Sequence, residues 1–370
     1  MSAIHARVDS FCRRFGLELP VLLAPMAGAP APALSIAVMQ AGGVGACGAL
    51  LMQPDEIAAW ADEVRAKANG AYQLNLWVPD PPPPRDAGQE RLLRGFLSDW
   101  GPPPAEDAGD ARPPDFAAQC EAVLSAKPPI VSSVMGVFPG EFVARLRRDG
   151  IAWFANVSTV AEARAAEAAG ADVIVAQGME AGGHRGSFDA LQAERRLVGS
   201  FALIPAVADA VEVPVVATGG IGDARGVAAA LLLGASAVQI GSAFLRCPEA
   251  GIHPAWAEAL AGVAPEDTIV TSVFSGRAGR SVATAYALAA MADEAPPPAP
   301  YPVQRGLTAA MRAHAAETGD VQRMQAWAGQ SVRLSRAEPA GRLVRHMWDG
   351  ALALLKEGHA VALRPGSEQP

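Results

Sequence analysis

The stretch PVVATGGIGDARGVAAALLLGASAVQIGSAF, residues 214–244, joins two apolar segments through an alanine-rich helical pattern. Both segments, Val215–Gly219 and Ala237–Ile240, are almost wholly apolar. Strands of a parallel sheet have this composition when helices cover both faces of the sheet. Each segment also runs into a glycine-containing turn, TGGIGD or QIGSAF. The stretch is therefore typical of a βαβ unit.

The same alternation of apolar segments and helical patterns continues upstream along the chain. Six further strands are predicted at Val21–Met26, Val44–Ala49, Tyr72–Val78, Ile130–Gly136, Ile151–Val157 and Asp172–Gly178. Helices are predicted at Ala31–Gln40, Pro54–Ala68 and Pro139–Arg148, and from a cap at Ser158 or Thr159 through Ala169. Eight strands in sequence order favour an α/β fold of the closed (β/α)8 TIM barrel type over an open doubly wound sheet.

Two proline-rich segments interrupt this rhythm. Residues 79–114 contain PDPPPP and GPPP and predict a long insertion after the third strand, near the mouth of the barrel. The second segment, APPPAPYP at Ala295–Pro302, predicts a semi-rigid connector. We therefore expect a barrel over residues 1–243, and over residues 244–370 the last barrel helix with a small helical C-terminal cap.

Composition limits the possible partners. The chain has 370 residues, of which 51% are hydrophobic and 18% charged, so it has enough apolar residues for a large core. It carries 30 Lys and Arg against 38 Asp and Glu, a net charge of −8, with no basic stripe. Such a surface repels phosphate backbones, so we expect no nucleic-acid partner.

Metal and membrane sites are not indicated either. The four cysteines are widely spaced and form no CxxC pair, which predicts free thiols without a zinc site: Cys12, Cys47, Cys120 and Cys247. No apolar run reaches the ~20 residues of a membrane span, and the charged N-terminus lacks the apolar core of a signal peptide. We expect a cytoplasmic monomer or homodimer with no bound metal.

The turns after the seventh and eighth strands predict a phosphate site. Barrel enzymes commonly bind phosphate there, through backbone N–H groups and a helix N-terminus. Gly219 and Gly220 allow the backbone to approach an anion closely, and Gly241 with Ser242 adds a hydroxyl donor. Glycines can also simply form tight turns, but two such turns in the correct spacing favour the phosphate site.

The glycine-rich loop QGMEAGGHRG, residues 177–186, follows the sixth strand. Gln177 offers both an amide donor and an acceptor to the edge of a heterocycle. A lone histidine is more often structural, yet His184 is the only histidine on a predicted catalytic loop and is flanked by glycines. We therefore favour a catalytic role for it. Glu180 and Arg185 are alternatively expected to form a salt bridge that shapes the loop.

Two weaker candidates lie earlier in the chain. Pro25 and Met26, in APMAGAP, form an apolar ledge that suits a flat ring system or ordinary core packing. Asn75, in YQLNLWVP, is a polar residue within a buried strand and needs a partner, either a ligand edge or a backbone group. Together these features suggest a flat, phosphorylated cofactor; FMN meets that description without excluding another phosphorylated ligand.

At these residues the sequence resembles the nitronate monooxygenases, formerly called 2-nitropropane dioxygenases. The similarity runs through LLAPMAG, AGGVGACGA, NLWVP, AQGMEAGGHRG, residues 214–244 and FSGRAGR. Near the C-terminus, YPVQRGLT at Tyr301–Thr308 and WAGQ at Trp327–Gln330 resemble the bacterial class I members. This C-terminal pair favours nitronate oxidation over the activities of relatives that share the barrel.

The resemblance implies an FMN-dependent oxidoreductase, with His184 as the catalytic residue. It implies non-covalent FMN contacts at Pro25, Met26, Asn75, Gln177, Gly182, Gly220, Gln239, Ile240, Gly241 and Ser242. Such enzymes oxidise a small-molecule nitronate or nitroalkane with O₂ to a carbonyl compound and nitrite, and propionate 3-nitronate is a typical substrate. The nearest alternative on this barrel is an FMN-dependent NAD(P)H reductase of the enoyl-ACP reductase or quinone reductase type. More distant alternatives are a sugar-phosphate isomerase and a non-catalytic binding module.

Three positions depart from the family pattern. Met135 stands where the family usually has an aromatic residue, and Gly279 and Thr284 stand where it prefers Ala and Asn. The insertion at residues 79–114 is also longer and richer in proline than the family pattern. These departures concern substrate preference and access to the pocket rather than the predicted flavin site.

Overall fold

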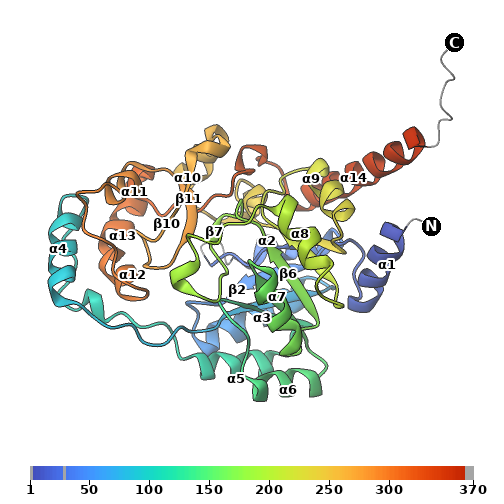
Figure 1. Cartoon of the computed structure of the whole chain (residues 1–370), viewed down its shortest axis with the longest axis horizontal. Coiled ribbons are helices and arrows are strands. Elements are labelled where there is room, and N and C mark those ends of the chain that lie inside the picture. Colours follow the sequence, from blue (N-terminus) through green and yellow to red (C-terminus); the bar gives the residue numbers. More distant parts are fainter. Residues whose placement is uncertain (1–2, 28–30, 363–370) are drawn as a thin grey trace, which may run out of the picture.

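Eight parallel strands form a barrel in the computed structural model, which describes residues 3–27 and 31–362 (Figure 1). The strands are β1 (Val21–Leu23), β2 (Gly45–Gly48), β3 (Tyr72–Trp77), β4 (Ile130–Val134), β5 (Ala152–Val157), β6 (Val173–Gln177), β8 (Val215–Thr218) and β9 (Ala237–Ile240). They are hydrogen-bonded in the order β1-β9-β8-β6-β5-β4-β3-β2. A parallel bridge between Leu22 and Val44 brings the two ends of the sheet together. The predicted (β/α)8 barrel is confirmed.

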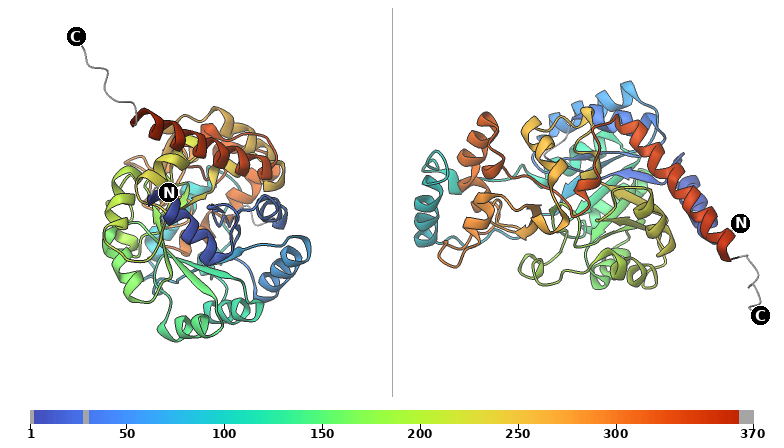
Figure 2. Two further views of the ribbon diagram at one scale, coloured as in Figure 1. Left: turned by 90° about the vertical axis from the view of Figure 1, so that its right-hand side faces the viewer. Right: turned by 90° about the horizontal axis from the view of Figure 1, so that it is seen from above.

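Helices follow the strands and cover the outside of the barrel (Figure 2). They are α2 (Pro32–Gln40), α3 (Pro54–Lys67), α5 (Phe116–Ala126), α6 (Gly140–Arg148), α7 (Val160–Ala168), α8 (Ser200–Ala208) and α9 (Ala224–Leu232). Local capping interactions determine where these helices begin and end. At the start of α7, for example, the Glu162 N–H donates to Thr159 Oγ1 at 3.2 Å, and the Thr159 N–H donates to Glu162 Oε2 at 3.1 Å. This is a capping box, and it begins at Thr159, one of the two predicted cap residues.

The last barrel helix is separated from its strand by about a hundred residues of sequence. It is α14 (Ala340–Ala362), which buries Leu343, Val344 and Met347 against α9 and α2. Side chains are described up to residue 356. None of the helices in the described part of the chain combines the length and apolarity that a membrane crossing requires.

An N-terminal helix, α1 (Ala3–Phe15), lies across one end of the barrel (Figure 2). Its Phe11 is 1% exposed and packs with Leu22 and Phe154 at the amino ends of the strands. Arg14 pairs with Asp172, just before β6, at 2.7 Å. The helix therefore covers the end of the barrel opposite to the carboxyl ends of the strands and leaves that rim for a ligand site.

A cap beside the barrel is built from two distant parts of the chain (Figure 1). The insertion supplies α4 (Ala87–Ser98), and the C-terminal part supplies α10 (Pro254–Ala259), α11 (Ala285–Ala290), α12 (Val303–Leu307) and α13 (Ala309–Thr318). Leu93 and Leu97 of α4 share one buried cluster with Tyr286, Leu307 and Met311. The predicted insertion and the predicted helical cap are thus one packed unit.

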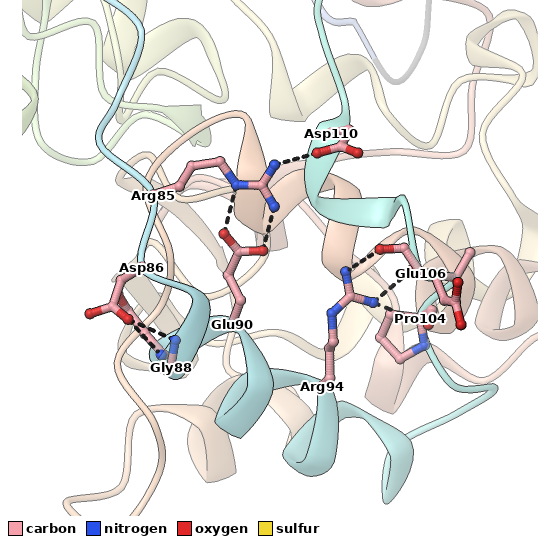
Figure 3. Close-up of polar contacts among 10 residues, drawn as sticks. Arg85, Asp86, Gly88, Glu90, Arg94, Pro104, Glu106 and Asp110 are labelled. Carbon is pink, nitrogen blue, oxygen red and sulfur yellow. Dashed lines mark hydrogen bonds and ion pairs between the residues drawn. The ribbon is translucent and has the colours of Figure 1, made fainter.

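Arginine side chains hold the proline-rich insertion in place (Figure 3). Arg85 donates to Glu90 at 2.7 and 2.5 Å and also pairs with Asp110. Arg94 donates to the backbone carbonyls of residues 104–106. Proline has no N–H and cannot continue a backbone hydrogen-bond ladder, so side-chain donors satisfy the nearby carbonyl groups instead.

The cap also contains strands that the sequence did not predict. β10 (Thr268–Thr271) pairs with β11 (Gly279–Val282), and β11 pairs with the two-residue strand β7 (Gly183–His184). Gly279 lies opposite His184 in this antiparallel pairing. The predicted catalytic loop is therefore held in a small sheet that joins the barrel to the cap.

Candidate active site

A cavity of about 350 Å³ opens at the carboxyl ends of the barrel strands. All twelve residues predicted for the site line it: Pro25, Met26, Asn75, Gln177, Gly182, His184, Gly219, Gly220, Gln239, Ile240, Gly241 and Ser242. The structure thus brings together residues from five separate segments of the chain. The individual role of each residue stays a prediction.

The glycine turns of the cavity need glycine for different reasons. Gly219 and Gly220 have φ of +101° and +73°, in the left-handed region that residues with a side chain rarely adopt. At Gly182 the reason is close packing, because a Cβ there would lie 2.5 Å from the Gly329 backbone nitrogen. The Gly329 N–H in turn donates to Ser242 Oγ at 2.9 Å. The WAGQ segment therefore packs directly against two of the predicted cofactor turns.

The predicted amide side chains have protein partners. Gln177 donates to the His184 carbonyl at 3.1 Å and accepts from the Gly186 N–H at 2.7 Å, which fixes the loop around the histidine. Asn75 Nδ2 donates to Ser132 Oγ at 3.0 Å. The partner of Asn75, which the sequence did not identify, is therefore a residue of the neighbouring strand. These bonds orient both side chains at the wall of the cavity.

Four other residues of the cavity wall carry donors that have no protein partner in the described residues. They are Trp77 Nε1, Asn156 Nδ2, Trp256 Nε1 and Gln325 Nε2, all of them buried. Buried polar groups are nearly always hydrogen-bonded, so four unpaired donors in one cavity point to a ligand rich in acceptors. None of these four residues was predicted for the site from the sequence. Asn156 carried the same signal as Asn75, a polar residue in an apolar strand, whereas Trp256 and Gln325 lie in the cap and had no local signal.

His184 is held by contacts on several sides. Its Nε2 lies 2.9 Å from Ser275 Oγ, and its ring lies 4.9 Å from the Trp77 ring and 4.8 Å from the Trp327 ring, centroid to centroid. Ser275 Oγ is itself fixed by the backbone N–H and carbonyl of Arg277, at 3.3 and 3.1 Å. The imidazole therefore has one defined orientation at the cavity wall.

The charge state of His184 follows from its surroundings. Burial lowers its pKa to about 3, and the positive charges of Arg305 and Arg277 contribute in the same direction. The imidazole is therefore neutral at physiological pH. A neutral imidazole has a single N–H to donate, and with this pKa it is a weak base towards a C–H group.

A buried ion pair lies beside the residues that hold the histidine in place. The side chain of Arg277 is 1% exposed, and its guanidinium pairs with Asp80 and donates to the Ser187 carbonyl. It also lies 5.9 Å from the centre of the Trp77 ring. Because Asp80 belongs to the insertion and Arg277 to the cap, this pair connects both with the wall of the cavity.

Glu180 and Arg185 do not form the salt bridge that was expected between them. Each of the two side chains has other partners. Glu180 accepts from the backbone N–H and the hydroxyl of Ser200, at 2.8 and 2.9 Å, and so caps the N-terminus of α8. Arg185 donates to the carbonyls of Gly178 and Gln177, at 2.6 and 3.3 Å. The loop is therefore shaped by two separate sets of bonds.

The structure explains two of the three departures from the family pattern. A Cβ at Gly279 would lie 2.8 Å from the Trp327 ring, so glycine allows this tryptophan to approach β11. Thr284 Oγ1 accepts from the Ala287 N–H at 3.3 Å and caps α11. Met135 lines the cavity with a φ of +72°, and nothing in the structure explains why a methionine occupies that position.

The carboxyl rim is the place where barrel enzymes bind their ligands, so the fold and the cavity define this chain as a TIM-barrel enzyme. The comparison with family models narrows the class. The model of the family described as nitronate monooxygenase matches residues 11–350. The chain belongs to this family, and it is an oxidoreductase.

Individual relatives agree with the family match. The nitronate monooxygenase of Paraburkholderia phytofirmans is 38% identical over 338 residues, which are 90% of this chain and 92% of that protein. The structure of nitroalkane oxidase from Streptomyces ansochromogenes is similar with a TM-score of 0.84 and 34% identity, and covers 92% of this chain and 98% of its own. FabK from Thermotoga maritima has a TM-score of 0.75 and 27% identity, over 95% and 98% of the two chains.

Proposed function

We propose that this protein is an FMN-dependent nitronate monooxygenase, which oxidises alkyl nitronates with O₂ to a carbonyl compound and nitrite. The observation that carries the proposal is the family match over residues 11–350. The cavity supports it, because one space at the rim of the barrel is lined by every residue that the family resemblance assigns to FMN and substrate.

The residues of the cavity fit FMN. The turns at Gly219–Gly220 and Gly241–Ser242 would hold its phosphate through backbone N–H groups. The unpaired donors of Asn156, Trp256 and Gln325 suit its acceptor atoms. When bound, FMN supplies the redox chemistry, while the protein positions the substrate and excludes competing reactions.

His184 would hydrogen-bond the nitro oxygens of the substrate. A nitronate has already lost its α-proton, so no strong base is needed to activate it. The lowered pKa of His184, about 3, suits this role better than proton abstraction from a neutral nitroalkane. A bound anion would favour the protonated imidazole and raise that pKa, which strengthens the hydrogen bond to the substrate.

The reductase remains the second candidate, and the similarity to FabK favours it. Anaerobic mixing separates the two functions. If the protein is a nitronate monooxygenase, propionate 3-nitronate bleaches the flavin absorption of the purified protein, and NADH or NADPH does not. Rapid bleaching by either nicotinamide, with no effect of the nitronate, would replace the proposed function by the reductase. A purified protein without flavin absorption would reject both.

A further inference from the structure

The turn between β10 and β11 carries a serine whose hydroxyl reaches the imidazole of His184. Ser275 is fully buried, and its Oγ lies 2.9 Å from His184 Nε2. The N–H groups of Ser275 and Gly276 both donate to the Ser272 carbonyl, at 3.2 and 2.7 Å, and hold the turn in place. His184 is fixed as well, because it pairs with Gly279 of β11. Backbone hydrogen bonds therefore set the distance between the two side chains.

The other bonds of this hydroxyl decide which of the two side chains donates to the other. Ser275 Oγ donates to the Arg277 carbonyl at 3.1 Å and accepts from the Arg277 N–H at 3.3 Å. A hydroxyl has one proton to donate and two lone pairs that accept. Its proton is used at the carbonyl and one lone pair at the N–H, so a lone pair remains for His184. The bond to the histidine therefore runs from Nε2–H to Oγ.

The reverse arrangement is less favourable. If the hydroxyl donated to Nε2, the Arg277 carbonyl would lose its hydrogen bond to Ser275. No other donor within residues 3–27 and 31–356 bonds to that carbonyl, and Arg277 is 1% exposed. A buried backbone acceptor without a partner costs free energy comparable to a lost hydrogen bond. The hydrogen-bond geometry thus favours the tautomer that carries its proton on Nε2.

The second ring nitrogen of His184 is left for a ligand. Nδ1 has no hydrogen-bond partner among the described residues, and the residue lines the cavity. In the neutral imidazole the single N–H is on Nε2, where Ser275 accepts it. Nδ1 therefore offers a lone pair, which repels the oxygens of an anion. A hydrogen bond from this imidazole to a nitronate needs a second proton, and the open position for that proton is Nδ1.

The charged groups around the imidazole disfavour that proton until an anion binds. Besides burial, the charges of Arg305 and Arg277 lower the pKa of His184. Asp80 forms an ion pair with Arg277, and Glu180, on the same loop as the histidine, accepts from the N-terminus of α8. Neither carboxylate is therefore available to the imidazole. A bound anion adds a negative charge beside Nδ1 and stabilises the imidazolium.

We propose that Ser275 is a positioning residue that keeps the proton of the neutral His184 on Nε2, so that a nitronate anion binds together with one proton, which Nδ1 takes up from solvent. This inference rests on the proposed function. Ser275 acts only through the histidine and takes no part in the oxidation itself. The charge-assisted hydrogen bond from the imidazolium is stronger than one from a neutral imidazole. Because the proton comes from solution, binding of the anion weakens as pH rises.

Nuclear magnetic resonance of the holoenzyme with ¹⁵N-labelled histidine tests the tautomer directly, because long-range ¹H–¹⁵N correlations distinguish a protonated from an unprotonated ring nitrogen. The signals that disappear in His184→Ala belong to this residue. We expect them to show a proton on Nε2 and none on Nδ1 at neutral pH. Ser275→Ala should give a mixture of the two neutral tautomers. The matched control is Ser281→Ala, which removes a buried cap hydroxyl that donates to the Val282 carbonyl, and it should keep the wild-type pattern.

Nitrite, the inorganic product of the proposed reaction, tests the coupled proton without turnover. Its Kd is measured from the change in flavin absorption between about pH 5 and pH 7, where nitrite is an anion. Uptake of one proton makes Kd rise about tenfold per pH unit in the wild type and in Ser281→Ala. In Ser275→Ala the neutral imidazole can carry its proton on Nδ1, so Kd should depend much less on pH. His184→Ala should remove the dependence.

The opposite results overturn the inference. A proton on Nδ1 of the wild-type His184, or an unmixed Nε2–H tautomer in Ser275→Ala, would show that the serine does not set the tautomer. A wild-type Kd for nitrite that is independent of pH, or no binding at the acidic end of the range, would exclude the coupled proton. The two wild-type measurements decide the inference even if Ser275→Ala does not fold. Neither needs turnover, so the proposed function is decided separately, by the anaerobic nitronate test.

Discussion

Replacing Asp80 with asparagine is expected to affect both the stability of the fold and the turnover of the site. The variant keeps the size of the side chain but removes the charge that faces the buried guanidinium of Arg277. The backbone of Arg277 fixes Ser275, and Ser275 contacts His184. A shift of Arg277 therefore reaches the imidazole, although Asp80 itself does not line the cavity.

The expected loss of stability follows from the burial of this ion pair. Breaking a buried ion pair by removing one partner costs about 3–5 kcal/mol. Because the Asp80 side chain is 26% exposed and Arg277 keeps its bond to the Ser187 carbonyl, we expect the lower end of that range. An unfolding entropy of about 2.1 cal/mol/K per residue, taken over 370 residues, converts ~3 kcal/mol into a Tm decrease of about 4 °C.

Differential scanning calorimetry and steady-state kinetics test this prediction together. Glu121→Gln is the control, since it removes the charge of an exposed ion pair, and solvent-exposed pairs contribute little to stability. We expect Asp80→Asn to lower both Tm and kcat while FMN occupancy stays complete, because the residues assigned to FMN lie mostly on the barrel. A Tm change no larger than that of Glu121→Gln would refute the reasoning.

Three further predictions address the site. His184→Ala should retain FMN but lose about 10²–10³-fold in kcat/KM, the usual cost of one preorganised donor, and an unchanged kcat/KM would exclude the assigned role. Gly241→Leu should release FMN, because the new side chain would enter the cavity beside Ala24 and Met26; full occupancy by absorbance would contradict the phosphate site. The pKa of His184 lies below its unfolded value of 6.5, so the unfolded state binds more protons between pH 6.5 and about 3. The contribution of this histidine to stability should therefore be lost as pH falls through that window, and a Tm difference between wild type and His184→Ala that is independent of pH would contradict it.

Much of the barrel and of its rim was predictable from sequence because the signals are local. An apolar segment such as Val215–Gly219 predicts a strand covered on both faces, and the glycines behind it predict a close turn. In a parallel barrel all strands end at the same rim, so residues that follow the strands meet there without further information. Predicted residues as distant in sequence as Pro25 and Ser242 line one cavity for this reason.

Only the tertiary structure decided how the remaining chain completes that rim. The pairing of Gly279 with His184 and the ion pair of Asp80 with Arg277 join segments far apart in sequence. The fold also brings Gln325 of the cap to the wall of the cavity. Periodicity shows which face of an element is buried, but it does not identify the partner against which that face packs. The charge state of the histidine likewise depends on burial and on cations brought in by the cap, neither of which a local pattern encodes.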